Sequence, residues 1–382
     1  MMFEGFEELE EGGGLEAAEA SLREDVLLAP RQNPDCPGQE EIEKALLQAV
    51  NSGALPHALI FAGPGGVGKS TMAFRLARYL LKNGSAGAAQ DSLFGESLPP
   101  AASLAIETDH PVFHKVASGG HPDLLTIGRP MDEKKGVQKS SVDVETARKV
   151  TPFLRMTPSE QGGWRIVIVD DADTMNRNAQ NALLKILEEP PPRVLLILIA
   201  HRAGAMIPTI RSRCRTFSFP ALPRGIVLDL LRRYEPAAEP KELEMIATIA
   251  EGSIGAAIRI LEEGGRESVQ SVMDLLSAWP EWDWKAIHQT AEMLGRHGQD
   301  KAFLGFRDIL LWVAQSLTMA KARGIGTLEA PLSEAFVPRL LAHYSLEQWS
   351  QICERLEEHF ACVQSANLDR RQGVIGAFAM FE

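Results

Sequence analysis

Apolar residues follow two different patterns along this chain, and the pattern changes near residue 220. Before that point, short continuous apolar runs alternate with segments whose apolar residues recur every three or four positions. The runs predict strands and the periodic segments predict helices. The expected strands are residues 57–62, 123–127, 164–170, 194–200 and 216–219, and the expected helices are residues 39–52, 72–81, 142–154 and 174–189.

The strand signals stop after residue 220. Residues 221–264 have the pattern of short helices, and residues 269–382 contain longer amphipathic ones such as 303–317 and 346–364. Strands that alternate with helices form a parallel sheet covered by helices on both faces. We therefore expect an α/β fold followed by an all-α region.

A chain of 382 residues is too long for one typical domain, and the patterns set the expected borders. We expect an α/β domain at 31–220, a small helical domain at 221–266 and a second helical domain at 267–382. Residues 1–30 carry nine acidic side chains against one arginine, which accounts for −8 of the formal net charge of −12. With few large apolar groups to bury, they are expected to form a disordered tail.

Composition excludes several classes of protein. No apolar run approaches the roughly 18 residues of a membrane span, and the acidic start of the chain is unlike a secretory signal. The four cysteines (Cys36, Cys214, Cys353 and Cys362) form no C-x-x-C pair, so we expect neither a disulfide framework nor a zinc site, and a cytoplasmic location. The formal net charge of −4 beyond residue 30 argues against a protein that binds nucleic acid without a partner protein.

The strongest chemical signal lies between the first expected strand and the helix that follows it. The sequence there fits the phosphate-binding pattern G-x-x-x-x-G-K-[ST], and its strand–loop–helix context makes the match specific. Backbone N–H groups of such a loop curl around a polyphosphate at the positive end of the helix. The residues expected to bind nucleotide are Gly63, Pro64, Gly65, Gly66, Val67, Gly68, Lys69, Ser70 and Thr71.

Two side chains of this loop have distinct roles, and an acid elsewhere completes the site. Lys69 is expected to reach the β- and γ-phosphates, and the Ser70 hydroxyl to bind Mg²⁺. Asp170 directly ends the apolar run 164–169, about one hundred residues after the loop, which is a suitable position for a second Mg²⁺ ligand. The sequence thus predicts a site for ATP with Mg²⁺.

Whether this site hydrolyses nucleotide depends on the next residue. Many ATPases carry a glutamate there that polarises the attacking water, whereas this chain has Asp171, which is one methylene shorter. A general base needs hydrogen-bond reach to the proton that it removes, and small displacements slow reactions by orders of magnitude. Asp171 is therefore a weak base candidate, and a solvated acidic turn formed with Asp173 is the alternative.

A third motif, Arg-Ser-Arg-Cys at residues 211–214, lies in a loop between two expected strands. An arginine at this place serves either a structural ion pair or a neighbouring subunit's γ-phosphate, as an arginine finger. The residue pattern alone does not decide between the two roles.

These motifs together resemble the AAA+ clamp-loader family of bacterial DNA replication. The resemblance runs from about Pro30 to the last residue and is strongest over 57–71 and 164–219, where four motifs stand in the family's order: the phosphate loop, DDAD, NAQNALLKILEEPPP and RSRC. It extends to EGSIGAA and ANLDRRQ in the helical region.

The resemblance implies an AAA+ P-loop NTPase domain, a small helical lid and a C-terminal helical collar that holds a five-membered ring. The implied partners are the gamma/tau and delta subunits, the beta sliding clamp and primer-template DNA. The chain would belong to the DNA polymerase III holoenzyme without polymerase chemistry of its own. In this family the RSRC-type motif supplies an arginine finger, and the matching residue is Arg213.

Departures from the family pattern argue for weak hydrolysis. The lid position at which motor subunits carry an arginine corresponds to Gly255, and a polar sensor threonine is missing near Ala200 or His201. The four-cysteine zinc module that many relatives carry is absent as well. A gamma/tau-type motor ATPase is the alternative, and these departures disfavour it.

Three further groups of residues are expected to have ordinary structural roles. His110, His114 and His121 are not expected to bind metal; the tryptophans at 279, 282 and 284 are expected to pack helices; and the lysines at 134, 135 and 139 are expected to be solvated rather than bound to DNA.

Overall fold

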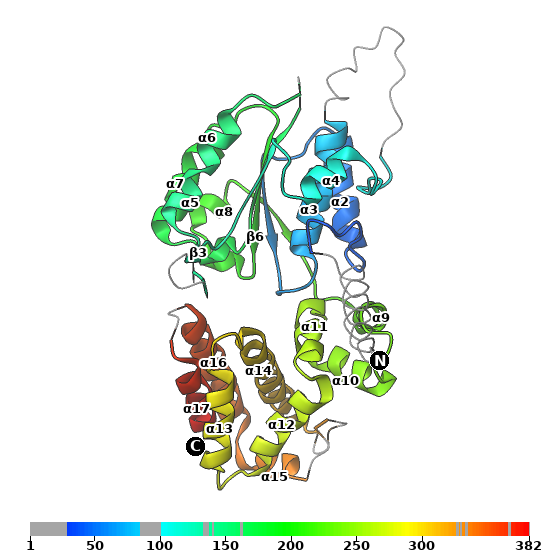
Figure 1. The fold of residues 1–382 in the computed structure, drawn as a ribbon. Coiled ribbons are helices and arrows are strands. Elements are labelled where there is room, and N and C mark those ends of the chain that lie inside the picture. Colours follow the sequence, from blue (N-terminus) through cyan, green and yellow to red (C-terminus); the bar gives the residue numbers. More distant parts are fainter. Residues whose placement is uncertain are drawn as a thin grey trace, which may run out of the picture.

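The computed structural model has two parts stacked one on the other, a sheet with its helices and a group of helices (Figure 1). It describes residues 29–381 except 85–100, 133–136, 140, 161–162, 326–327, 329–330, 333–334 and 366–367. The acidic segment 1–28, and Lys134 and Lys135, lie outside the described residues.

A five-stranded parallel sheet, ordered β2-β5-β6-β1-β7, forms the centre of the first part. Strands β1, β5 and β6 are buried along their whole length, which explains their continuous apolar runs. The strands are β1 (Ala58–Ala62), β2 (Leu124–Ile127), β5 (Arg165–Val169), β6 (Val194–Ala200) and β7 (Arg215–Ser218). All five expected strands are confirmed within a few residues.

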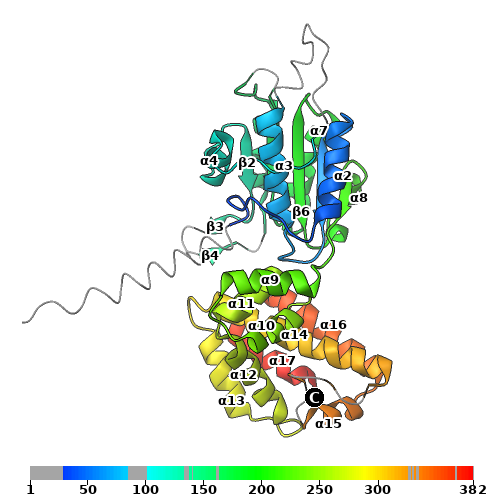
Figure 2. The same cartoon turned by 90° about the vertical axis from the view of Figure 1, so that its right-hand side faces the viewer.

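Alternate residues of each strand face opposite sides of the sheet, and each side has its own helices (Figure 2). Leu59 and Phe61 of β1 face the cluster that contains the first group of helices, whereas Ala58 and Ile60 face the second. The first group is α2 (Glu40–Asn51), α3 (Lys69–Asn83) and α4 (Pro111–Ala117); the second is α5 (Val144–Arg148), α6 (Val150–Arg155), α7 (Arg177–Glu188) and α8 (Pro208–Arg211).

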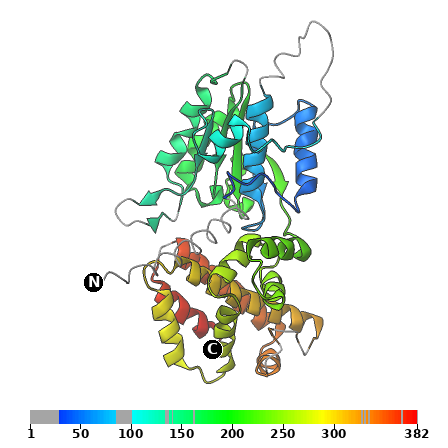
Figure 3. The ribbon, with the colours of Figure 1, turned by 45° about the vertical axis from the view of Figure 1, so that its right-hand side comes forward.

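Among the residues described after β7, every regular element is a helix, as expected, and these helices lie against one end of the sheet part (Figure 3). The region expected to be the lid contains α9 (Arg224–Tyr234), α10 (Pro240–Ile249) and α11 (Ile254–Glu262). The region expected to be the collar contains α12 (Gly265–Ser277), α13 (Trp284–Leu294), α14 (Asp300–Arg323), α15 (Val337–His343), α16 (Leu346–Ser365) and α17 (Arg370–Phe378). The domain borders themselves stay a prediction.

The structure differs from the sequence predictions at three places. Residues 128–140, for which no strand was predicted, contain an antiparallel ribbon of β3 (Met131–Asp132) and β4 (Val137–Gln138). The helix expected at 142–154 is two helices, α5 and α6, that meet at Lys149. Helix α4, which starts at Pro111 and is capped by the His110 side chain, was not expected because seven residues are too few to show periodicity.

The tryptophans have the structural roles expected of them. Trp279 and Trp282 are buried, and Trp282 contacts the rings of Phe378 and Phe381. Short 3-10 turns complete the fold at η2 (Ala172–Thr174), η3 (Ala203–Ala205) and η4 (Ala379–Phe381). Among the described helices, none has both the length and the apolar character needed to cross a bilayer.

Candidate nucleotide site

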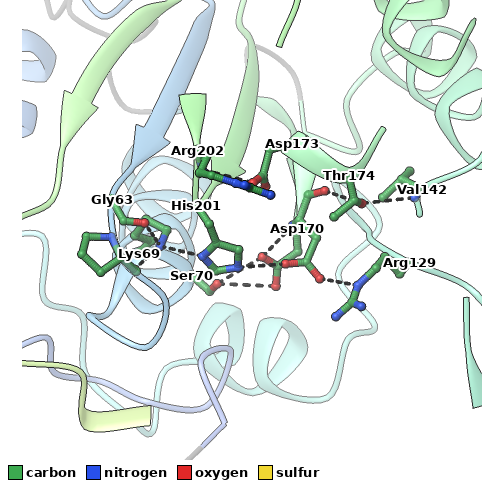
Figure 4. Close-up of polar contacts among 12 residues, drawn as sticks. Gly63, Lys69, Ser70, Arg129, Val142, Asp170, Asp173, Thr174, His201 and Arg202 are labelled. Atoms are coloured by element: carbon green, nitrogen blue, oxygen red, sulfur yellow. Dashed lines mark hydrogen bonds and ion pairs between the residues drawn. The ribbon is translucent and has the colours of Figure 1, made fainter. Parts of the chain in front are cut away.

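Three neighbouring parallel strands bring the candidate site together, because their carboxyl ends meet at one edge of the sheet. The phosphate loop follows β1, Asp170 and Asp171 follow β5, and His201 follows β6. Crevices at the carboxyl edge of open parallel sheets are where such folds bind ligands. The two motifs predicted from sequence to form one site therefore do lie together (Figure 4).

Glycine is required in the phosphate loop at specific positions. Gly63, Gly66 and Gly68 have φ values of 144°, 69° and 97°, which disfavour any residue with a side chain. A Cβ on Gly63 would lie 2.3 Å from the carbonyl oxygen of Phe219. Buried Gln39 fixes the loop from behind, since its Nε2 donates to the carbonyl oxygens of Val67 and Pro220, at 3.1 Å each.

Lys69, the first residue of α3, is 4% exposed and folded back over its own loop. Its ammonium donates to the carbonyl oxygen of Gly63 at 2.7 Å and to that of Pro64, and lies 3.3 Å from His201 Nδ1. Burial lowers the pKa of Lys69 to about 8. A buried ammonium that donates to backbone carbonyl oxygens of its own loop is well prepared to bind an anion.

Ser70 and Asp170 face each other across the site. The Ser70 hydroxyl lies 3.5 Å from both carboxylate oxygens of Asp170, a separation that leaves room for further coordination. Burial, together with the charge of Asp171, raises the pKa of Asp170. Hydroxyl and carboxylate oxygens are the ligands that Mg²⁺ prefers, so this donor set fits the ion. Bound Mg²⁺ would also neutralise the carboxylate that burial destabilises.

Asp171 is held on both sides. Arg129 Nε donates to its Oδ2 at 2.7 Å, and His201 Nε2 lies 3.1 Å from its Oδ1. Although burial alone would raise the pKa of Asp171, these two partners together lower it. Its φ of 49° is unusual for a residue other than glycine. Both carboxylate oxygens are therefore engaged and the backbone is fixed, which disfavours a role for Asp171 as a general base.

Sequence reasoning did not assign these two partners of Asp171. His201 occupies the place where a polar sensor was expected, and it connects Asp171 to Lys69. A polar residue directly after a buried strand next to the phosphate-loop strand is a signal that could have identified it. Arg129 follows β2 after one intervening glycine, and nothing in its local sequence indicates a partner 42 positions away.

The lid region contacts the phosphate loop directly. Ser253 Oγ donates to the carbonyl oxygen of Gly65 at 2.8 Å, and the Gly255 amide donates to that of Gly66 at 3.2 Å. A Cβ on Gly66 would come within 2.8 Å of the Gly255 backbone, and a Cβ on Gly255 would lie 3.0 Å from the Cα of Gly66. The absence of a side chain at Gly255 therefore permits close approach of α11, which the sequence did not indicate.

Arg213, the candidate finger, lies near the amino ends of the strands, whereas the phosphate loop lies at their carboxyl ends. It precedes β7, whose Arg215 pairs in register with Leu59 near the start of β1, whereas the loop begins after Ala62 at the other end of that strand. Arg213 NH2 lies 2.9 Å from Glu188 Oε1, and its NH1 donates to the carbonyl oxygen of Thr209. With its side chain 36% exposed, Arg213 faces away from its own nucleotide site.

The remaining sequence expectations concern metals and cysteines. The four cysteines form no disulfide, and burial raises the pKa of Cys36 and Cys214 to about 12. Across the part of the chain that the structure describes, no cluster of three or more metal-ligating side chains was found. Of the histidines considered, His110 caps α4 and His121 Nδ1 accepts from the Asp123 amide. Lys139 is exposed and pairs with Asp143.

Comparison with known proteins finds relatives for part of this chain. Residues 38–223 match the family described as "DNA polymerase III, delta subunit". Over this part the chain is similar to clamp-loader subunits of DNA polymerase III. It is 31% identical over 220 residues to DNA polymerase III subunit delta' of Pseudomonas aeruginosa, covering 57% of this chain and 60% of the relative.

Two further relatives extend the comparison. The tau subunit of DNA polymerase III from Escherichia coli is 27% identical over 71% of this chain and 39% of its own length. Replication factor C small subunit 1 of Pyrobaculum islandicum is 28% identical over 61% of this chain and 59% of its own. The chain thus spans no more than 60% of the length of these relatives.

Proposed function

We propose that this chain is a delta-prime-type subunit of a DNA polymerase III clamp loader, helping to load the beta sliding clamp onto primed DNA. The observation that carries the proposal is that the candidate nucleotide site and Arg213 lie at opposite ends of the strands of one sheet. The candidate nucleotide site lies at the carboxyl ends of the strands, while Arg213 lies at their amino ends and is exposed. A subunit with this layout holds its own nucleotide and presents an arginine to a neighbour.

The proposed nucleotide is ATP with Mg²⁺. The loop amides and Lys69 would hold the phosphates, while Ser70 and Asp170 would hold the ion. Bound Mg²⁺ would supply charge neutralisation between the phosphates. The chain's own residues would orient the phosphates and exclude water from them, since Lys69 is almost fully buried.

Weak hydrolysis follows from the surroundings of Asp171. A general base must be free to accept a proton from water, and its pKa should lie near the working pH. Asp171 meets neither condition, because Arg129 and His201 occupy its oxygens and lower its pKa. The proposed role of Asp171 is therefore to position His201, and the site is expected to bind nucleotide better than it turns it over.

The proposed partners are the gamma/tau and delta subunits in a hetero-pentameric ring, with primer-template DNA reached through the complex. Resemblance to delta' and tau relatives supports this assembly. Arg213 would then act in trans, on the ATP of the adjacent subunit. Its ion pair with Glu188 is about half exposed and so costs little to exchange for a phosphate.

The experiment that tests this proposal measures ATP binding and turnover of the isolated chain. We expect saturable Mg²⁺-dependent ATP binding, with turnover at least about a hundredfold below a typical kcat near 10 s⁻¹. Asp171→Asn is the matched variant, since it keeps the shape and removes the charge. We expect it to leave this low rate unchanged. Turnover near the typical value, abolished by Asp171→Asn, would instead support the gamma/tau-type motor alternative.

A further inference from the structure

The outer surface of α5, α6 and α7 is basic. These three helices lie side by side on one face of the sheet (Figure 1). They carry two acids, Glu145 and Glu188, of which Glu188 pairs with Arg213. Against these stand five exposed cations that form no ion pair with any described residue: Arg148, Lys149, Arg155, Arg177 and Lys185. We call this surface the basic face, and its net positive charge attracts polyanions.

The N-terminal segment of this chain has a composition that complements the basic face. Residues 1–28 contain nine acidic side chains and one arginine, which gives a formal net charge of −8. Phe3 and Phe6 stand among the first of these acids. On the basic face, Pro152 is exposed and Met156, at the end of α6, is 60% exposed. Both surfaces therefore combine charge of one sign with a few apolar side chains.

The described chain begins near the edge of the sheet that the basic face adjoins. A Cβ on Gly119, which lies between α4 and β2, would be 2.6 Å from Arg31 NH1. Strand β2 is an edge strand, and its Ile127 lies in one apolar cluster with Val150 of α6. The segment that precedes residue 29 therefore has to pass only one edge of the sheet to reach the basic face.

Chain length and tethering favour a contact within one molecule. A coil of 28 residues has a root-mean-square end-to-end distance of about 30 Å, whereas a domain of about 190 residues has a radius of gyration of roughly 16 Å. A tethered partner also acts at an effective concentration in the millimolar range. Each exposed ion pair contributes little by itself, but several together suffice for binding at such a concentration.

We propose that residues 1–28 dock on the basic face of their own chain and screen it from other polyanions. Carboxylates of the segment would lie against the five cations, with Phe3 or Phe6 against Met156. The inference is independent of nucleotide binding, because none of these cations belongs to the candidate nucleotide site. Displacement of the segment would expose the basic face, so the contact would act as an autoinhibitory cover.

Carbodiimide cross-linking of the full chain tests the contact directly, because this reagent joins carboxylates to lysine amines without a spacer. We expect residues 1–28 to link to Lys149 and Lys185 about tenfold more than to Lys241 and Lys285, which are exposed on the helical part. In about 1 M NaCl, where the Debye length is about 3 Å, this preference should disappear. Equal linking to all four lysines, or links mainly between isotope-labelled and unlabelled chains, would overturn the inference.

A variant of the basic face keeps both reporter lysines. Arg148→Gln, Arg155→Gln and Arg177→Gln together remove three exposed cations, and they should lower the links to Lys149 and Lys185 about tenfold. Because these side chains are exposed and unpaired among the described residues, the variant should fold, and thermal unfolding checks that it does.

The matched control replaces three exposed arginines of α9. Arg224→Gln, Arg232→Gln and Arg233→Gln change the net charge of the chain by the same amount, yet they should leave the links to the two reporter lysines intact. An equal decrease in both triple variants would reduce the contact to unspecific attraction between an acidic segment and a charged protein, and the inference would fail.

Binding of a short fluorescent single-stranded DNA measures the screening. Glu7→Gln, Glu8→Gln, Glu10→Gln and Glu11→Gln together change the net charge of residues 1–28 from −8 to −4. They should tighten DNA binding by the full chain about tenfold at low salt, and this gain should vanish when the three arginines of the basic face are also replaced. Unchanged DNA affinity, or the same gain without those arginines, would show that the segment does not cover this face.

Discussion

Lys69→Ala is expected to weaken ATP binding by the isolated chain by about a hundredfold or more, equivalent to roughly 3 kcal/mol. The ammonium already contacts two carbonyl oxygens of the loop, so it need not give up a carboxylate to reach a phosphate. Removing it deletes the main positive charge at the site and leaves the anion beside Asp170, Asp171 and Asp173. Fluorescence or calorimetric titration with MgATP measures the loss.

A matched control is available on the same helix. Lys82 lies in the last turn of α3, where it pairs with Glu107 at the surface. Lys82→Ala changes the net charge equally but should leave ATP affinity within a factor of two. Similar affinities for both alanine variants would mean that the loop does not bind phosphate through Lys69.

Arg213→Ala is expected to have the second large effect, and only in the assembled ring. Removal of an arginine finger lowers turnover at the site that it serves by roughly a thousandfold or more. The ring containing this variant should assemble normally, because the contacts of Arg213 within the described part of its own chain are a half-exposed ion pair and one backbone hydrogen bond. Pre-steady-state measurement should then show a burst smaller by one ADP per ring.

Arg211→Ala is the control for the finger, since Arg211 stands two residues earlier in the same motif and is also exposed. It changes the charge of the same surface by the same amount, yet it should leave the burst intact. An unchanged burst in Arg213→Ala, or an equal decrease in both variants, would show that Arg213 is no finger.

The sheet and the main nucleotide-binding elements could be predicted from sequence because their physics is local. Continuous apolar runs such as 194–200 arise only where a strand is buried on both faces. The loop at 63–70 requires glycines at fixed positions, so the spacing of these glycines identifies the loop in the sequence alone. The acid after β5 could be placed opposite the loop because parallel strands end at one edge.

What could not be predicted depends on contacts between segments that are far apart in the chain. Arg129 and His201 meet at Asp171 across three different loops, so the pairing that disfavours Asp171 as a base appears only in the structure. The approach of Gly255 to Gly66 likewise joins α11 to the loop, and the ion pair from Arg259 to Asp308 joins α11 to α14. None of these contacts produces a periodicity or a motif.

Short helices and strands could not be predicted from the sequence either. Helix α4 has seven residues, and each strand of the β3–β4 ribbon has two. Such lengths carry too few positions to show a period of 3.6 or 2. The break between α5 and α6 at Lys149 has no glycine or proline at that residue to mark it.

The central claim is that the main contribution of this chain is an arginine that acts on a neighbour's ATP, rather than ATP hydrolysis at its own site. The most direct test compares DNA-stimulated ATPase of two reconstituted rings, one with Lys69→Ala and one with Arg213→Ala in this subunit. We expect the Arg213→Ala ring to lose far more activity than the Lys69→Ala ring. The opposite order, with Lys69→Ala abolishing activity and Arg213→Ala sparing it, would contradict the account.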